Sequence, residues 1–166
     1  MTLGLSLLSG TILAMVLHEL GHAIAARLCN VWVSEFGLGV GRRVCRVRLG
    51  SLSFSLRAWP VGSFVMLDGE ALQQRPPAQQ LFVHLGGILM NLLAGALFFG
   101  TNVGWLNLLL AAGNLLPLYQ HDGWKCGMVI VQSLLNRKSQ PAEWAFTFSG
   151  GFVSLVIAWL VIRLFV

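Results

Sequence analysis

Long apolar segments alternate with short polar ones along most of this chain. A bilayer core of about 30 Å takes about 20 helical residues, and four segments have that length and composition: residues 3–29, 81–100, 103–118 and 144–166. The pattern predicts an integral membrane protein, mainly α-helical, with about four transmembrane helices. We expect residues 1–166 to form a single domain.

Residues 36–67 follow a different period. Apolar and polar residues alternate over 44–49 and again over 52–56, which is the two-residue period of a β-strand. Gly50 and Ser51 can turn between the two runs, so we expect a β-hairpin between the first and second spans. Lipid does not tolerate open sheet edges. The hairpin should therefore lie at the membrane face or in a protein-lined cavity. Residues 68–80 are expected to form a polar loop, and residues 125–143 a connection of polar to mixed composition.

Composition agrees with a membrane location. Hydrophobic residues make up 56% of the chain and charged residues 10%, whereas a soluble domain has about 25% charged residues. The net charge is +5, and five arginines fall in one segment: Arg42, Arg43, Arg46, Arg48 and Arg57. Basic patches also bind nucleic acid, but the interleaved apolar residues and flanking spans argue against that partner. The three cysteines form no CxxC pair, so neither a disulfide framework nor a thiolate zinc site is indicated.

Loop charge predicts the orientation in the membrane. Basic residues gather at 42–57 and at 125–138, with Arg137 and Lys138 at the centre of the second connection. Cytoplasmic loops are rich in lysine and arginine, so both segments should be cytoplasmic and both termini should lie on the opposite side. Arg163, near the C-terminal end, opposes this assignment weakly.

The first span contains the sequence HELGH, residues 18–22. Residues four apart share a helix face, so His18 and His22 can converge on one ion. In the HExxH arrangement the two histidines bind zinc and the glutamate, here Glu19, acts as general base on a zinc-bound water. The alternative is that these groups satisfy one another in a helix bundle, but desolvating all three without a metal would be costly.

A catalytic zinc site takes a third protein ligand. Asp122, at the end of the third span, is a candidate, and His84 and His121 are rivals that could instead be supporting polar groups.

These motifs together resemble the site-2 protease family of intramembrane zinc metalloproteases. HELGH fits the family's HExxH, and NLLPLYQHDG (114–123) fits its NxxPxxxxDG. GGILMNLLAG (86–95) is similar to the glycine- and asparagine-containing motif of the intervening span. Residues 36–70 are similar to the membrane-associated β-hairpin and glycine-rich loop of bacterial members. The agreement in order and spacing covers roughly residues 10–130.

The resemblance implies roles for individual residues. His18, His22 and Asp122 would bind one zinc ion per chain, and Glu19 would be the general base. Asn114 would contact the substrate or the developing oxyanion; its alternative role is a helix-breaking hydrogen bond near Pro117.

The resemblance also implies how substrate is held. Asn91 and Gly62 would contact it, although for Asn91 a helix–helix hydrogen bond is an equal alternative. The hairpin would receive an unwound substrate segment by strand addition.

The implied activity is hydrolysis of peptide bonds within or near transmembrane segments. The implied partners are a membrane-protein substrate, the lipid bilayer and a regulatory membrane protein. The implied location is a bacterial inner membrane, with the active site towards the cytoplasm. The family's PDZ and CBS domains do not fit in this sequence, and Ile88 stands where many members have proline. Such differences bear on substrate preference and gating.

Three other functions remain as alternatives. A catalytically silent scaffold of the same fold would be expected to have lost Glu19 or a ligand, and neither is lost. A metal transporter would need a chain of polar residues through the other spans. A different HExxH peptidase would take a glutamate as third ligand, and the remaining glutamates, Glu35, Glu70 and Glu143, lie in unsuitable segments.

Overall fold

The computed structural model describes residues 3–135 and 140–165. The chain divides into two compact units, Met1–Ala112 and Gly113–Val166; the single domain predicted above stays a prediction. The first unit holds α1 (Leu3–Leu28), β1 (Val33–Leu49), β2 (Leu52–Leu67), α2 (Gly69–Gln73), α3 (Pro77–Leu97) and most of α4 (Asn102–Leu115). The second holds the end of α4, then α5 (Asp122–Leu134) and α6 (Gln140–Phe165).

Three of the described helices are long and apolar enough to cross a membrane. These candidate spans are Gly4–Leu28, Pro77–Leu97 and Gln140–Leu160, which correspond to the first, second and fourth predicted spans. The third corresponds to α4, whose 14 residues extend only about 21 Å at 1.5 Å per residue. The mainly helical membrane fold is confirmed, and the number of about four spans stays a prediction.

The connection predicted over residues 125–143 is corrected by α5, which fills most of it. The mixed composition of this segment concealed an amphipathic helix. Its first residue, Asp122, is a favourable charge at a helix N-terminus. Arg137 and Lys138 lie outside the described residues. The polar connection at 68–80 likewise contains α2 and the first turn of α3.

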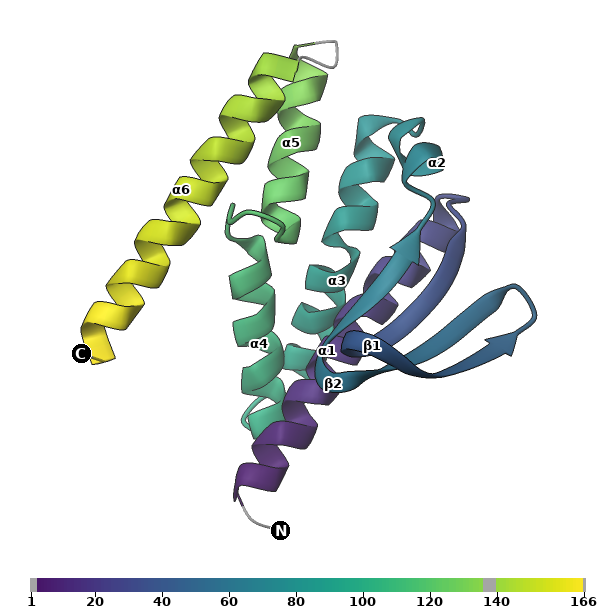
Figure 1. Ribbon diagram of the computed structural model, residues 1–166, viewed down its shortest axis with the longest axis vertical. Coiled ribbons are helices and arrows are strands. Elements are labelled where there is room, and N and C mark those ends of the chain that lie inside the picture. The colour runs from purple at the N-terminus through teal and green to yellow at the C-terminus, as the bar shows by residue number, and fades with distance from the viewer. Residues whose placement is uncertain (1–2, 136–139, 166) are drawn as a thin grey trace. The chain divides into compact units, whose positions relative to one another are not determined.

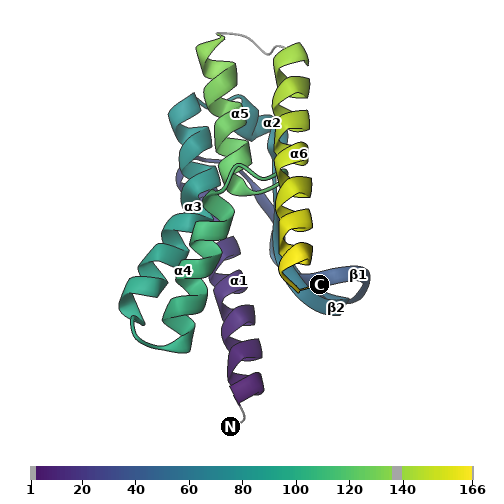
Figure 2. The same cartoon turned by 90° about the vertical axis from the view of Figure 1, so that its left-hand side faces the viewer.

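The predicted hairpin is present, and it is more strongly bent than a simple pair of strands. β1 and β2 pair through the turn at residues 50–51, with partners such as Val47 and Phe54. Residues 35–38 pair with residues 63–66 and also with residues 53–56. The bend in β1 contains Gly39 and Gly41, whose φ angles of 92° and 87° suit glycine. Figures 1 and 2 show the hairpin projecting from the helices of this unit, while Leu52, just after the turn, packs against a buried cluster that includes Ala25 and Val33.

Two glycines bring α1 and α3 into backbone contact. A Cβ added to Gly21 would lie 2.2 Å from the carbonyl oxygen of Gly86, and one added to Gly86 would lie 2.6 Å from that of Gly21. Small residues permit this approach between membrane helices. As a result, the face of α1 that carries HELGH lies directly against α3. Towards the C-terminal end of α1, a buried cluster joins these helices to the base of the hairpin and α2: Ala25, Ala26, Cys29, Val31, Val33, Leu72 and Val83.

Glycines also let α5 and α6 pack within the second unit. A Cβ on Gly127 would meet the ring of Phe146 at 2.4 Å, and one on Gly150 would meet Trp124 at 2.8 Å. The Trp124 and Phe146 rings stack with centroids 6.1 Å apart. The second unit is therefore a helical pair joined to the end of α4.

Candidate metal centre

The structure brings His18 and His22 together on one face of α1. Both side chains are buried, at 7% relative exposure, and their Nε2 atoms lie 3.2 Å apart. The rings meet edge to face with centroids 4.7 Å apart. This is the convergence that the four-residue spacing predicts.

Each histidine is oriented by a hydrogen bond at its other ring nitrogen. His22 Nδ1 lies 2.8 Å from the carbonyl oxygen of Val83. A carbonyl can only accept, so the proton is on Nδ1. His18 Nδ1 lies 2.5 Å from Oδ1 of Asn91. Both contacts come from α3, so the helix crossing sets the orientation of both rings.

The amide of Asn91 is itself fixed in one orientation. Its Nδ2 donates to the carbonyl oxygen of Ala14 at 3.0 Å and to Oδ1 of Asn107 at 2.7 Å. Asn107 in turn donates to the carbonyl oxygen of Val103 at 2.8 Å. Both asparagines are fully buried. Because the amide nitrogen of Asn91 is used in this way, its oxygen must face His18 and accept the Nδ1 proton.

These hydrogen bonds decide what the facing Nε2 atoms can do. In a neutral imidazole with the proton on Nδ1, the Nε2 atom carries a lone pair. Two such lone pairs 3.2 Å apart repel each other, and a metal ion shared between them removes that repulsion. Histidines that bind metals usually donate their other ring nitrogen to a carbonyl or carboxylate oxygen, which matches both contacts here.

A glycine on α3 keeps space beside the two Nε2 atoms. A Cβ added to Gly87 would lie 2.5 Å from Nε2 of His22 and 2.7 Å from Nε2 of His18. Any larger residue would therefore occupy the place where both nitrogens point. The paired lone pairs and this glycine cradle fit a metal ion.

Glu19 follows His18 on α1 and is half-buried. Its Oε1 atom lies 3.4 Å from the hydroxyl of Ser63, which donates to the carbonyl oxygen of Met15 at 3.0 Å. Ser63 belongs to β2, so the second half of this strand runs alongside the part of α1 that carries the glutamate. Gly62, the preceding residue, has a φ of 86°, and a Cβ there would meet nothing within 4 Å.

The other predicted site residues lie in the second unit. Asn114 is in the last turn of α4, and Asp122 is the first residue of α5. Asp122 is buried and its Oδ1 accepts a hydrogen bond from Nζ of Lys125 at 3.0 Å. Its neighbour Gly123 has no room for a side chain, because a Cβ would lie 2.1 Å from the carbonyl oxygen of Leu115. The Asp-Gly pair thus packs the start of α5 against the end of α4.

The two rival candidates, and two residues that the sequence did not single out, can now be placed. His84 lies on α3 and is half-buried, while His121 Nδ1 lies 3.3 Å from the carbonyl oxygen of Tyr119. Sequence reasoning missed Asn107, although a polar residue in an apolar span is itself a functional signal. Gly87 was named only as part of the GGILMNLLAG motif, and no role was predicted for it. Substrate contact by Asn91 stays a prediction; its described hydrogen bonds are to His18, Ala14 and Asn107.

Comparison with known proteins adds the family. The model of peptidase family M50 matches residues 7–104, a range that contains HELGH, the hairpin and α3. A protein of Clostridium perfringens named "Putative zinc metalloprotease CPE1693" is 34% identical over 93 residues, covering 51% of this chain and 28% of that protein.

Two further relatives give the same picture. A Helicobacter pylori protein named "Putative zinc metalloprotease" is 33% identical over 95 residues, covering 49% of this chain and 27% of its own. An Arabidopsis thaliana protein named "Probable membrane metalloprotease ARASP2, chloroplastic" is 33% identical over 91 residues, covering 48% and 21%. The match thus spans only about a quarter of each relative's length. The family match, the HELGH pair and its supports on α3 lead to one identification: the chain belongs to peptidase family M50, the site-2 protease family.

Proposed function

We propose that this chain is a zinc endopeptidase that hydrolyses peptide bonds within or near transmembrane segments of membrane proteins. The observation that carries the proposal is the pair of buried histidines with Nε2 atoms 3.2 Å apart and both Nδ1 atoms held by acceptors on α3. The site lies in a helix apolar enough to cross a membrane. The relatives named as metalloproteases support the same activity.

His18, His22 and Asp122 are the proposed ligands of one zinc ion per chain. Two imidazoles and a carboxylate are ligands that zinc prefers, and three protein ligands leave a position open. When bound, zinc supplies Lewis-acid chemistry by polarising a carbonyl and lowering the pKa of a water. Asp122 enters this set through the NxxPxxxxDG resemblance, and its burial is consistent with the role.

Two residues of the chain are proposed to transfer protons and to stabilise the developing negative charge. The Glu19 carboxylate takes a proton from the attacking water and passes it to the leaving amine. The Asn114 amide donates to the oxygen on which negative charge develops, a contribution that can reach several kcal/mol. Burial of the histidines strengthens such interactions by excluding bulk water.

We propose that substrate binds by adding a strand to the hairpin. The peptide bonds of an intact helix are shielded by its own turns, so the substrate must unwind before it is cut. Residues 63–66 pair on one side with residues 35–38, and Ser63 contacts Glu19. An unwound segment along the other edge of β2 would gain main-chain hydrogen bonds beside the general base. Gly62 and Asn91 are proposed to contact it there.

The proposed setting is a bacterial inner membrane. The active site would open towards the cytoplasm, with both termini on the opposite side and α4 contributing the third of four spans. Five arginines in the hairpin support the cytoplasmic assignment of that segment. A regulatory membrane protein is the proposed source of substrate selection.

Substitution of the general base tests the activity. The chain is co-reconstituted with a panel of fluorescently tagged single-span peptides, and cleavage is followed by gel. Glu19→Gln should abolish cleavage and keep zinc, whereas the matched control Glu70→Gln, on exposed α2, should cleave normally. Cleavage by Glu19→Gln at the original rate would refute the mechanism. A zinc-loaded original chain that cuts none of the panel would favour the silent scaffold.

A further inference from the structure

A chain of hydrogen bonds runs from His18 on α1 through Asn91 on α3 to Asn107 on α4. Nδ1 of His18 lies 2.5 Å from Oδ1 of Asn91, and Nδ2 of Asn91 lies 2.7 Å from Oδ1 of Asn107. Both asparagines are fully buried, although burying an amide among apolar helices is costly unless its hydrogen bonds are made. The chain therefore connects α4 to one of the two histidines of the candidate metal centre.

The far end of this chain fixes the orientation of the Asn107 amide. Its Nδ2 atom lies 2.8 Å from the carbonyl oxygen of Val103, one turn earlier on α4. Because a carbonyl oxygen can only accept, the amide nitrogen of Asn107 must face Val103 and the amide oxygen must face Asn91. Asn107 is thus an acceptor for Asn91, in an orientation that α4 itself sets.

Asn91 is held in place by two acceptors. Its Nδ2 donates to Oδ1 of Asn107 at 2.7 Å and to the carbonyl oxygen of Ala14 at 3.0 Å, which uses both of its N–H groups. If this amide flipped, its own oxygen would face two other oxygens, and both hydrogen bonds would become contacts between acceptors. Leaving buried polar groups unsatisfied in this way is costly. One acceptor from α1 and one from α4 therefore keep the Asn91 oxygen on His18.

This orientation matters because His18 has an alternative tautomer, with its proton on Nε2. That proton could be donated to Nε2 of His22, 3.2 Å away. The His22 atom carries a lone pair, since the Val83 carbonyl holds the His22 proton on Nδ1. The two rings would then satisfy each other without a metal, and Nε2 of His18 would have no lone pair to offer one. The two tautomers have the same charge, so the surroundings of the ring decide between them.

We propose that Asn107 is a positioning residue that keeps His18 in its metal-binding tautomer. In the alternative tautomer, Nδ1 of His18 would be an acceptor facing the Asn91 oxygen, which is also an acceptor. Only a flip of the Asn91 amide relieves that contact, and Asn107 opposes the flip. The amide on α4 therefore acts on the ring through Asn91, by disfavouring the arrangement in which the histidines need no metal. The inference rests on the metal site proposed above and adds α4 to the helices that control it.

The tautomer of His18 can be measured without any metal. The full chain is labelled with nitrogen-15 at its histidines and stripped of metal by a chelator in detergent. Long-range proton–nitrogen correlation spectra at pH about 8, where imidazole groups are ordinarily neutral, distinguish Nδ1–H from Nε2–H. The signals that disappear in His18→Gln identify this residue. Zinc affinity, by competition with a chelating dye, is the second measurement.

Two variants of similar shape separate hydrogen bonding from packing. Asn107→Leu removes the acceptor, whereas Asn107→Asp keeps an oxygen that can accept from Asn91 in either protonation state. Asn102→Leu makes the same change at an exposed position of α4 and is the matched control. If the leucine variant misfolds by circular dichroism, Asn107→Ser replaces it. The serine hydroxyl can bond to the Val103 carbonyl one turn back, but it is one bond shorter than the amide and loses the contact with Asn91.

The expected result is a change of tautomer that follows the acceptor. The original chain and Asn102→Leu should show His18 with its proton on Nδ1. Asn107→Leu or Asn107→Ser should populate the Nε2–H tautomer and weaken zinc binding about tenfold. This is the lower end of the 10- to 100-fold typical for lost outer contacts of a metal ligand, because the carbonyl of Ala14 still opposes the flip. Asn107→Asp should keep the Nδ1–H tautomer and most of the zinc affinity.

Three results would overturn the inference. The first is an Nε2–H tautomer of His18 in the metal-free original chain. The second is an unchanged tautomer in the folded leucine or serine variant. The third is an equal loss of zinc affinity in Asn107→Leu and Asn107→Asp, which would make Asn107 a packing residue. A chain that shows the expected tautomers but binds no zinc would contradict the proposed zinc function while upholding control of the tautomer by Asn107.

Discussion

Gly87→Ala should disable the metal centre while leaving the helices intact. The added Cβ would lie 2.5 Å from Nε2 of His22, and 2.6 Å and 2.7 Å from Cε1 and Nε2 of His18. Ordinary contacts to a Cβ begin near 3.4 Å, so the rings or α3 must yield by almost an ångström. Neither ring can rotate away without losing its hydrogen bond to Val83 or Asn91.

The size of the effect follows from how precisely such a site must be held. Functional groups need to lie within about 0.5 Å of their productive positions, and a misplacement of about 1 Å can cost about a hundredfold in rate. Loss of the contacts that orient metal ligands typically costs 10- to 100-fold in affinity. We therefore expect zinc affinity to fall by at least about tenfold and cleavage by about a hundredfold.

The assay is zinc affinity by competition with a chelating dye, with helicity by circular dichroism. Alanine favours helix over glycine by up to about 1 kcal/mol, so helicity should stay the same or rise while zinc is lost. Gly4→Ala, also in a helix but with open space around the new Cβ, is the matched control and should bind zinc normally. Unchanged zinc affinity in Gly87→Ala would refute the assignment of the two Nε2 atoms as metal ligands.

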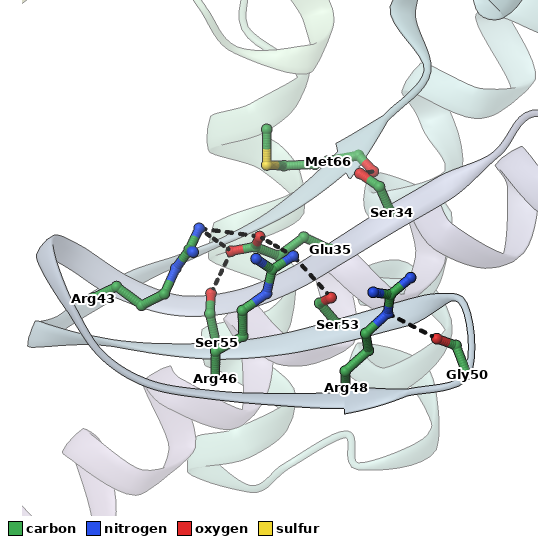
Figure 3. Close-up of polar contacts among 9 residues, drawn as sticks. All are labelled: Ser34, Glu35, Arg43, Arg46, Arg48, Gly50, Ser53, Ser55 and Met66. Carbon is green, nitrogen blue, oxygen red and sulfur yellow. Dashed lines mark hydrogen bonds and ion pairs between the residues drawn. The ribbon is translucent and has the colours of Figure 1, made fainter.

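Three further predictions concern the support of the site and of the hairpin. Asn91→Leu removes the acceptor for His18 Nδ1 and should weaken zinc binding 10- to 100-fold; unchanged affinity in the dye assay would contradict the role of this amide. The hydrogen bond from Ser55, together with the charges of neighbouring arginines, holds the pKa of the Glu35 carboxyl below its ordinary value of 4.5 (Figure 3). This stabilisation should be complete above that value and be lost as pH falls through the lowered pKa. Ser55→Ala should raise the pH at which the hairpin loosens in acid, measured with a polarity-sensitive fluorophore on the exposed Cys45; an unchanged midpoint would contradict this role of Ser55. Chelation of the metal should lower the melting temperature and added zinc should restore it, because a ligand of the folded state stabilises that state; a Tm unaffected by chelator would contradict a metal that holds the fold.

The sequence predicted the features of the site and fold that are set by residues close together in the chain. The four-residue spacing of His18 and His22 placed both rings on one face whatever α1 packs against. The alternation of apolar and polar residues, with Gly50, located the hairpin turn between β1 and β2. These features depend on contacts close in the chain, so pattern alone was sufficient.

The missed features depend on contacts between distant segments. The chain from His18 through Asn91 to Asn107 joins residues 73 and then 16 positions apart, and its register is set by the Gly21–Gly86 contact between helices. Helix α5 was missed because polar and apolar residues are mixed along residues 122–134, so this segment contains no long apolar run. The bend of the hairpin was missed because it needs left-handed φ angles at glycines, and a glycine-rich sequence permits such angles without requiring them.

Zinc content tests the central claim most directly. The purified chain in detergent is measured beside His18→Ala and Asp122→Ala, each with folding checked by circular dichroism. The account predicts about one zinc per chain in the original protein and loss of that zinc in both variants. Zinc retained by Asp122→Ala would contradict the proposed ligand set and direct attention to His84 or His121. A correctly folded original chain that holds no zinc would contradict the account itself.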